Sequence, residues 1–228
     1  IILSSSFGLY TWMNNPESQM VAVTVRAGSK AEMALPDGTF VHLNAATNLE
    51  YDVNNSKQRL VKLSGEAFFD VAKNPDCPFK VIINDLQIEV VGTSFNVKTY
   101  KKDIVETSLL SGRIRISGGS LPHEYTLSTG QKATYSAMDR TLRISKADAH
   151  VEAGWRDNYL IFESTPLIDV IAQIERWYGV EIRLHHKQIA QDLLSGSFRN
   201  ESIQNVIRSL SIQYGFKYEI HKDIITIY

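Results

Sequence analysis

From residue 20 to about residue 150, apolar and polar residues alternate in short runs. Leu86, Ile88 and Val90, for example, are separated by single polar residues. A period of two is typical of antiparallel strands that bury one face. Turn-forming residues separate the runs about every ten residues, as they do in all-β folds. We therefore predict an all-β domain over residues 20–150, built as a sandwich, a barrel or a coil of stacked short strands.

Near residue 155 the period changes to that of amphipathic helices. One apolar stripe runs from Leu167 to Tyr178, and Gly179 is suited to end that helix. A second stripe starts after Ser202, a good N-cap, and stops before Gly215. The two segments align without a gap at an offset of 36 residues, and each reads strand, helix, strand. This pattern predicts a duplicated βαβ unit with both helices on one face of a small sheet.

This second domain is predicted to be a small α+β domain over residues 155–228, so that the whole chain is mainly β. Its expected strands are Tyr159–Glu163, Val180–His185, Leu194–Phe198, Phe216–His221 and Ile224–Tyr228. A polar segment, Ala147–Asn158, connects the two domains, and we expect Trp155 to anchor the junction. Relative motion is the default expectation for two domains joined in this way.

The first residues of the chain differ from the rest. Residues 1–16 contain no charged side chain. A membrane-spanning helix needs roughly 20 apolar residues, so this stretch is too short to cross a bilayer alone. We interpret residues 1–19 as the end of a truncated membrane anchor, with Tyr10 and Trp12 at the interface, where aromatic residues collect. An ordinary first strand and a disordered leader are the alternatives.

The composition excludes several classes of function. The chain has 24 Lys and Arg against 25 Asp and Glu, so it lacks the basic excess of a nucleic-acid-binding domain. The one cysteine, Cys77, can form neither an internal disulfide nor a CxxC metal site. No histidine lies near Cys77 in the sequence, so we read it as an inert loop residue rather than a catalytic thiol.

No motif points to a metal, a cofactor or an enzyme. The six histidines form no HxH or HExxH pattern, and the glycine-rich phosphate loops and the GxSxG motif are absent. Asp37 and Glu66 could suggest the paired carboxylates of a glycosidase. However, Asp37-Gly38 is an ordinary turn sequence, and Glu66, at the start of a strand, is expected on a solvated face. We predict no cofactor, no metal and no activity on another molecule.

Several motifs follow one another along the chain. They are Leu35-Pro36-Asp37-Gly38-Thr39 with Asn44, then Gly65-Glu66-Ala67-Phe68-Phe69, Pro78-Phe79, Val91-Gly92-Thr93 with Phe95-Asn96-Val97, Leu110-x-Gly112 and Leu127 with Gly130-Gln131. Their order resembles the periplasmic region of FecR-type anti-sigma factors. The duplicated tail, with Glu175-Arg176-Trp177-Tyr178-Gly179, resembles the C-terminal domain of relatives from Bacteroidetes. The resemblance covers residues 20–228.

This resemblance implies a function and partners. Such regulators hold an extracytoplasmic-function sigma factor through a cytoplasmic segment, which this chain would lack. They are anchored in the inner membrane by one helix and extend a periplasmic part. The resemblance implies that this part receives a signal from the signalling domain of a TonB-dependent outer-membrane transporter. Ile224, Ile225, Thr226, Ile227 and Tyr228 form an uncharged final strand, and we predict that they bind this partner by edge-to-edge strand addition.

The resemblance also raises one chemical possibility. Some relatives cleave themselves at a Gly–Thr bond that is matched here by Gly92-Thr93. The Thr93 hydroxyl could attack the Gly92 carbonyl if the backbone were strained, and glycine permits such strain. The alternative is a bulge in which Gly92 lets strands approach and Thr93 simply favours the strand. We favour the alternative.

Two other functions stay open at this point. A carbohydrate- or ligand-binding β-domain would need exposed aromatic residues, such as Phe68, to line a groove. A hydrolase would need a nucleophile beside a base, and the sequence suggests no such pair.

Overall fold

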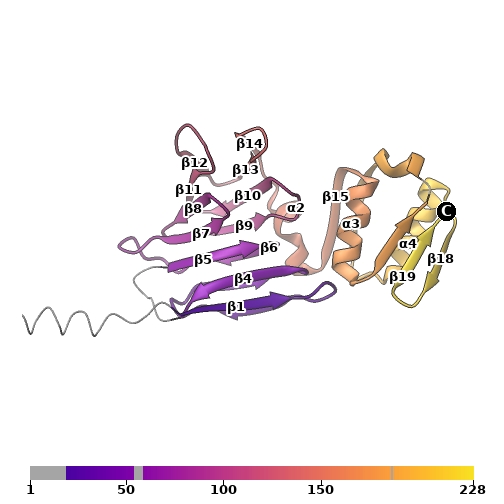
Figure 1. Ribbon diagram of the computed structural model, residues 1–228, viewed down its shortest axis with the longest axis horizontal. Helices are drawn as coiled ribbons and strands as arrows, with labels where there is room; N and C mark the ends of the chain where they lie inside the picture. The colour runs from indigo at the N-terminus through magenta and orange to yellow at the C-terminus, as the bar shows by residue number, and fades with distance from the viewer. Residues whose placement is uncertain (1–18, 54–58, 186) are drawn as a thin grey trace, which may run out of the picture.

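The structure is a computed structural model that describes residues 19–53, 59–185 and 187–228. Residues 20–146 form one lobe, here called the β lobe, and residues 159–227 form a second, here called the C-terminal lobe (Figure 1). A short helical segment connects them. The mainly β class predicted from the sequence is confirmed.

The β lobe consists of two seven-stranded sheets. In spatial order, the first sheet contains β1 (Met20–Val25), β4 (Thr47–Asp52), β5 (Arg59–Ser64), β7 (Phe79–Ile83), β8 (Leu86–Val90), β11 (Arg113–Gly118) and β12 (Tyr125–Ser128). The second contains β14 (Thr141–Lys146), β13 (Gln131–Ser136), β10 (Ile104–Ser111), β9 (Ser94–Lys98), β6 (Glu66–Asp70), β3 (Phe40–Leu43) and β2 (Ala31–Ala34). All neighbouring strands are antiparallel except β5 and β7.

The chain changes sheet after every one or two strands, so the β lobe is a sandwich wound like a coil. The inward positions of the alternating runs from both sheets form one core. At its centre Phe69 stacks on Phe95, with ring centroids 5.2 Å apart, and packs against Phe79. The alternation seen in the sequence therefore identifies this core directly.

The C-terminal lobe contains two helices and two small sheets. Its helices are α3 (Leu167–Tyr178) and α4 (Ile203–Tyr214), and a 3₁₀ helix, η2, spans Lys187–Gln191. In the two-stranded sheet, β15 (Tyr159–Pro166) pairs antiparallel with β17 (Leu193–Arg199). In the other sheet, β19 (Ile224–Ile227) lies between β16 (Glu181–Leu184), which is parallel to it, and β18 (Tyr218–His221), which is antiparallel.

The helix boundaries follow from the sequence signals. Ser202 caps α4 by accepting a hydrogen bond from the backbone N–H of Asn205. Gly179 and Gly215 end the two helices with φ angles of 69° and 71°, the left-handed conformation that glycine adopts without steric cost. The single sheet expected for this lobe is wrong, however. Side chains of both sheets and both helices share one core.

The connecting segment folds into α2 (Ala149–Ala153) and a 3₁₀ helix, η1 (Gly154–Asp157). The predicted membrane anchor over residues 1–19 lies outside the described residues except for Gln19. In the described part of the chain, no helix is long and apolar enough to span a bilayer.

Candidate functional site

A buried carboxylate lies where the β lobe meets the connecting segment. Glu66, the first residue of β6, is only 7% exposed. Its Oε1 accepts a hydrogen bond from Asn96 Nδ2 over 2.9 Å, and its Oε2 accepts one from Asn44 Nδ2 over 2.8 Å. Asn44 follows β3 and Asn96 lies in β9, the two strands that flank β6. The expectation of a solvated face for Glu66 is wrong, because these two amides replace water around the carboxylate.

Trp155 extends this network into the connecting segment. Its Nε1 donates a hydrogen bond to Asn96 Oδ1 over 3.1 Å, and the side chain is buried. Trp155 packs with Ala153 and Phe68 in a small separate core. The predicted anchoring role of Trp155 is therefore confirmed. Phe68 is 4% exposed and lies under the guanidinium of Arg156, so it cannot line a carbohydrate groove.

The turn between β1 and β2 makes a second contact across the junction. The backbone N–H of Gly28 donates to the carbonyl of Arg176, near the end of α3, over 2.8 Å. A Cβ on Gly28, whose φ is 77°, would lie only 3.1 Å from the Tyr178 carbonyl oxygen and 3.3 Å from the Cα of Gly179. Glycine is thus required at this turn both for the backbone conformation and for the close approach of the two lobes.

Lys30, in the same connection, reaches the connecting segment. Its Nζ donates to the carbonyl of Trp155 over 2.7 Å and to Oδ1 of Asn158 over 3.0 Å. It also lies 3.7 Å from the ring centroid of Trp177, a cation–π contact. Burial lowers the pKa of Lys30 to about 8, against the opposing attraction of the Glu66 carboxylate. Lys30 therefore joins residues of the β lobe, the connecting segment and α3.

Arg176 of α3 contacts the β lobe through an aromatic ring. Its guanidinium carbon lies 4.2 Å from the ring centroid of Tyr100, whose hydroxyl donates to the carbonyl of Ala45. Burial, and then the nearby Glu66 carboxylate, raise the pKa of Tyr100. The phenol is thus held neutral beneath the arginine.

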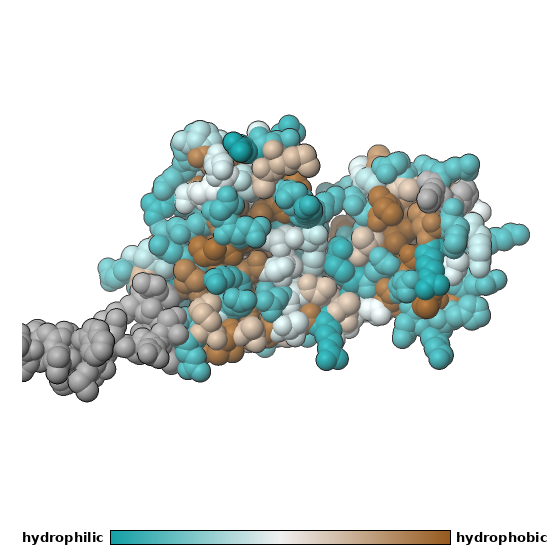
Figure 2. Space-filling model, viewed as in Figure 1, coloured by the Kyte–Doolittle hydropathy of each residue, from teal (hydrophilic) through white to brown (hydrophobic). Residues whose placement is uncertain are grey.

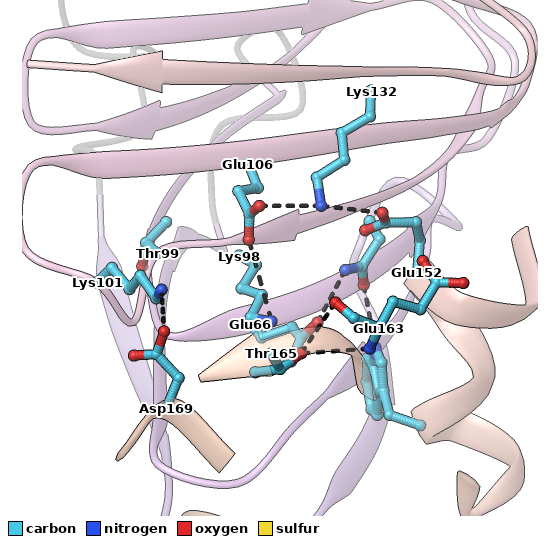
Figure 3. A network of polar contacts seen from close by, with 12 residues as sticks. Glu66, Lys98, Thr99, Lys101, Glu106, Lys132, Glu152, Glu163, Thr165 and Asp169 are labelled. Carbon is cyan, nitrogen blue, oxygen red and sulfur yellow. Dashed lines mark hydrogen bonds and ion pairs between the residues drawn. The ribbon is translucent and has the colours of Figure 1, made fainter. Parts of the chain in front are cut away.

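A groove of about 720 Å³ runs between the lobes, at the indentation visible in Figure 2. Ion pairs cross it or line it (Figure 3). Lys132 of β13 bonds Glu106 of β10 and Glu152 of α2, each over 2.9 Å. Lys101, after β9, bonds Asp169 of α3 over 2.7 Å. Burial alone would raise the pKa of Glu106, but Lys132 and Lys98 hold it below its ordinary value.

These residues are arranged to hold two lobes together rather than to react. Every basic side chain that crosses the junction has a carboxylate, carbonyl or aromatic ring as its partner. Among the described residues, no three His, Cys, Asp or Glu side chains gather as metal ligands would. We therefore take the junction formed by Glu66, Asn96, Trp155, Lys30 and Arg176 as the candidate site. It is called the lobe junction below.

Comparison with known proteins identifies the family. Two crystal structures of a candidate anti-sigma factor from Parabacteroides distasonis ATCC 8503 match this chain, each with a TM-score of 0.82. Their sequences are 30% and 29% identical to it, and the matches cover 91% and 92% of this chain and 98% and 99% of theirs. The family model described as FecR protein matches residues 21–115, and the one described as FecR, C-terminal, matches residues 159–227. The chain belongs to the FecR family. The resemblance seen in the sequence is confirmed, and no curated protein matches.

In this FecR-family protein, three of the sequence motifs meet at the lobe junction. Asn44, Glu66 and Asn96 come from separate motifs and form one hydrogen-bonded group. All three are members of the sequence motifs, but only Glu66 was given an expected position, on a solvated face. One signal could have found the site: Phe68 alternates with the apolar Ala67 and Phe69, so it lies with Glu66 and Asp70 on the opposite face of the strand. An aromatic residue there indicates that something covers that face.

Asp37 and Cys77, considered earlier for chemistry, have structural roles in this FecR-family fold. Asp37 Oδ1 accepts from the backbone N–H of Thr39, as expected for a turn. Its Oδ2 also pairs with Nη1 of Arg59 over 3.2 Å, an ion pair that is nearly buried. Arg59 Nε in turn donates to the carbonyl of Cys77 over 2.6 Å.

Gly92 and Thr93 lie in the bend between β8 and β9, where the chain passes from one sheet to the other. A Cβ on Gly92 would lie 2.9 Å from the Cα of Lys73, so the packing of these backbones requires glycine. The φ of Gly92 is not positive. Thr93 is 3% exposed, and its Oγ1 donates to the carbonyl of Arg113 over 3.1 Å. This geometry favours the packing role that was also preferred from the sequence.

The structure corrects the mode of contact predicted for Ile224, Ile225, Thr226, Ile227 and Tyr228. The first four form β19, the central strand of its sheet, which is paired on both sides. A partner strand cannot add to β19, because neither of its edges is free. Tyr228 is 52% exposed and stacks on His185, with ring centroids 5.8 Å apart.

Proposed function

We propose that this chain is the periplasmic signal-relay region of a transmembrane anti-sigma factor. It receives a signal from the signalling domain of a TonB-dependent outer-membrane transporter and controls an extracytoplasmic-function sigma factor. The observation that carries this proposal is the nearly full-length match to a candidate anti-sigma factor of the FecR family.

The lobe junction supports the relay. The partner docks on the C-terminal lobe, and α3 carries Arg176 and Asp169 from that lobe to the β lobe. The carbonyl of Arg176 also accepts from the backbone N–H of Gly28, in the turn after β1. A change in the placement of α3 thus reaches the turn that follows β1, the first strand of the described residues, through one backbone hydrogen bond. A partner shifts the equilibrium between two placements of α3 by the difference between its binding free energies for them.

A titration tests this function. The probes are the purified N-terminal signalling domains of the TonB-dependent transporters of the source organism. Isothermal titration calorimetry is expected to show saturable binding of the chain to one of them, and size-exclusion chromatography a complex. A signalling domain from a transporter of an unrelated organism is the control. Absence of both binding heat and a complex with every one of the source organism's domains would contradict the proposal.

A further inference from the structure

One strand edge of the C-terminal lobe is open to an added strand. Among the described residues, β17 pairs with β15 and with no other strand. Ser195, Gly196 and Ser197 of β17 are exposed. A Cβ added to Gly196 would meet no heavy atom within 4 Å, so the face of the strand is uncovered at this residue. The outward N–H and C=O groups of this stretch can therefore pair with another chain.

The other free edges of this lobe are less suited to strand addition. β16 and β18 have only four residues each, and exposed charged side chains lie along both. Glu181 and Arg183 of β16 form an ion pair over 2.7 Å. β15 carries the exposed, charged Glu163 and lines the groove between the lobes. Charge and short length are features that protect strand edges from pairing. β17 has seven residues, and Ser195–Ser197 carry no charged side chain.

A groove lies between Phe198, near the end of β17, and α4. It has a volume of about 360 Å³ and is lined by Phe198 from β17 and by the outer face of α4. Its apolar wall is formed by Phe198, which is half-buried, and by Ile212. Ile212 is 75% exposed, which is unusual for a large apolar side chain on a helix whose other face is buried.

The groove also contains one uncommitted positive charge. Arg208 lies on α4 between the apolar wall and Glu201, and it forms no ion pair with any described residue. The Glu201 carboxylate is already bound by Asn205 Nδ2 over 2.8 Å. An incoming segment with an acidic side chain opposite Arg208 would be complementary to this charge.

We infer that an extended segment of the signalling partner adds to the free edge of β17 as a third strand. Its backbone pairs with Ser195–Arg199, one apolar side chain packs on Phe198 and Ile212, and one acidic side chain binds Arg208. Strand addition gives affinity through main-chain hydrogen bonds, and the pockets beside the strand give specificity. This inference rests on the proposed function, because its occupant is the transporter signalling domain.

The test uses the whole chain and the purified signalling domain that binds it in the titration above. The variants Arg208→Glu and Ile212→Asp change the charged and the apolar part of the groove. Arg183→Glu on β16 and Met138→Asp, in the turn before β14, are matched controls, since both side chains are exposed and neither lines the groove. Dissociation constants are measured for all four variants, and circular dichroism checks that each is folded. Hydrogen exchange with mass spectrometry follows the amides of residues 195–199.

We expect Arg208→Glu and Ile212→Asp each to raise the Kd by about tenfold or more, while the controls change it by less than about twofold. Amides 195–199 are expected to exchange more slowly in the complex. Binding that is unaffected by both groove variants, without protection of these amides, would overturn the inference and leave the proposed function standing. Failure of the unaltered chain to bind the signalling domain would overturn both.

Discussion

The indole Nε1 of Trp155 donates a hydrogen bond to Oδ1 of Asn96 over 3.1 Å, and the same Asn96 side chain donates to Glu66. Through this pair the connecting segment is bound to β6 and β9, in the middle of the second sheet of the β lobe. The polar hinge expected from the sequence is therefore a docked helical segment. Movement of the connecting segment relative to the β lobe requires that this contact break.

Replacing Trp155 by Phe tests the contribution of that hydrogen bond. The ring still fills the small core with Phe68 and Ala153, but Asn96 Oδ1 loses its donor. A buried acceptor left without a partner costs about 1–3 kcal/mol in the free energy of unfolding. Urea denaturation followed by circular dichroism measures the loss. Met138→Ala, at a side chain 79% exposed, should change the value by less than about 0.5 kcal/mol. Equal values for the two variants would contradict the role assigned to Trp155.

Glu66→Gln tests the buried carboxylate. Two amide N–H groups point at its oxygens, and glutamine offers only one oxygen to accept them. One donor of Asn44 or Asn96 then faces an NH₂ group, so we expect a loss of about 1–3 kcal/mol in the free energy of unfolding. The same substitution at Glu124, whose side chain is 61% exposed, is the control and should be nearly neutral. A Glu66→Gln variant as stable as this control would show that the carboxylate is not needed.

The Lys30 amine predicts a specific pH dependence of stability. Its folded pKa of about 8 is below the ordinary lysine value of 10.5, so between these pH values the unfolded chain binds more protons. The contribution of Lys30 to the free energy of unfolding therefore rises as the pH increases across this window. We expect the stability of the unaltered protein relative to Lys30→Met to increase between about pH 8 and pH 10.

Chemical denaturation at several pH values measures that difference. Lys146→Met, at an exposed residue of β14, is the control and should give a difference that does not depend on pH. A difference for Lys30→Met that is equally flat would mean that the amine keeps the ordinary lysine pKa in the folded protein.

The Gly92–Thr93 bond is expected to stay intact. Gly92 has no positive φ, and the Thr93 hydroxyl is bound to the Arg113 carbonyl. Intact-mass spectrometry of the purified chain should show one species and no fragment that ends at Gly92. Such a fragment, present in the unaltered chain and absent from Thr93→Ala, would establish self-cleavage and reverse this expectation.

Local features of the fold could be predicted from the sequence. The ends of α3 and α4 follow from Ser202, Gly179 and Gly215, because capping depends on a few neighbouring residues. The alternating runs identify the core of the β lobe, because the period of two fixes which side chains face inward.

Strand neighbours and the lobe junction could not be predicted in the same way. Periodicity shows which face of a strand is buried but not which strand lies beside it, so β19 was expected at an edge although it is central. Glu66 was expected in water because its neighbours in sequence say nothing of Asn44, Asn96 and the covering Trp155. These three partners come from three segments distant from Glu66 in the sequence, which only the folded chain brings together.

The central claim is that the lobe junction passes a signal between the lobes, and a reporter for the controlled sigma factor tests it most directly. The full-length protein and its Trp155→Phe variant are compared in the native host with and without the inducer, at equal protein levels by immunoblot. We predict that Trp155→Phe binds the transporter signalling domain with a Kd within about twofold of the unaltered protein, yet loses most of the induced reporter response. Normal binding together with a normal response would contradict the claim.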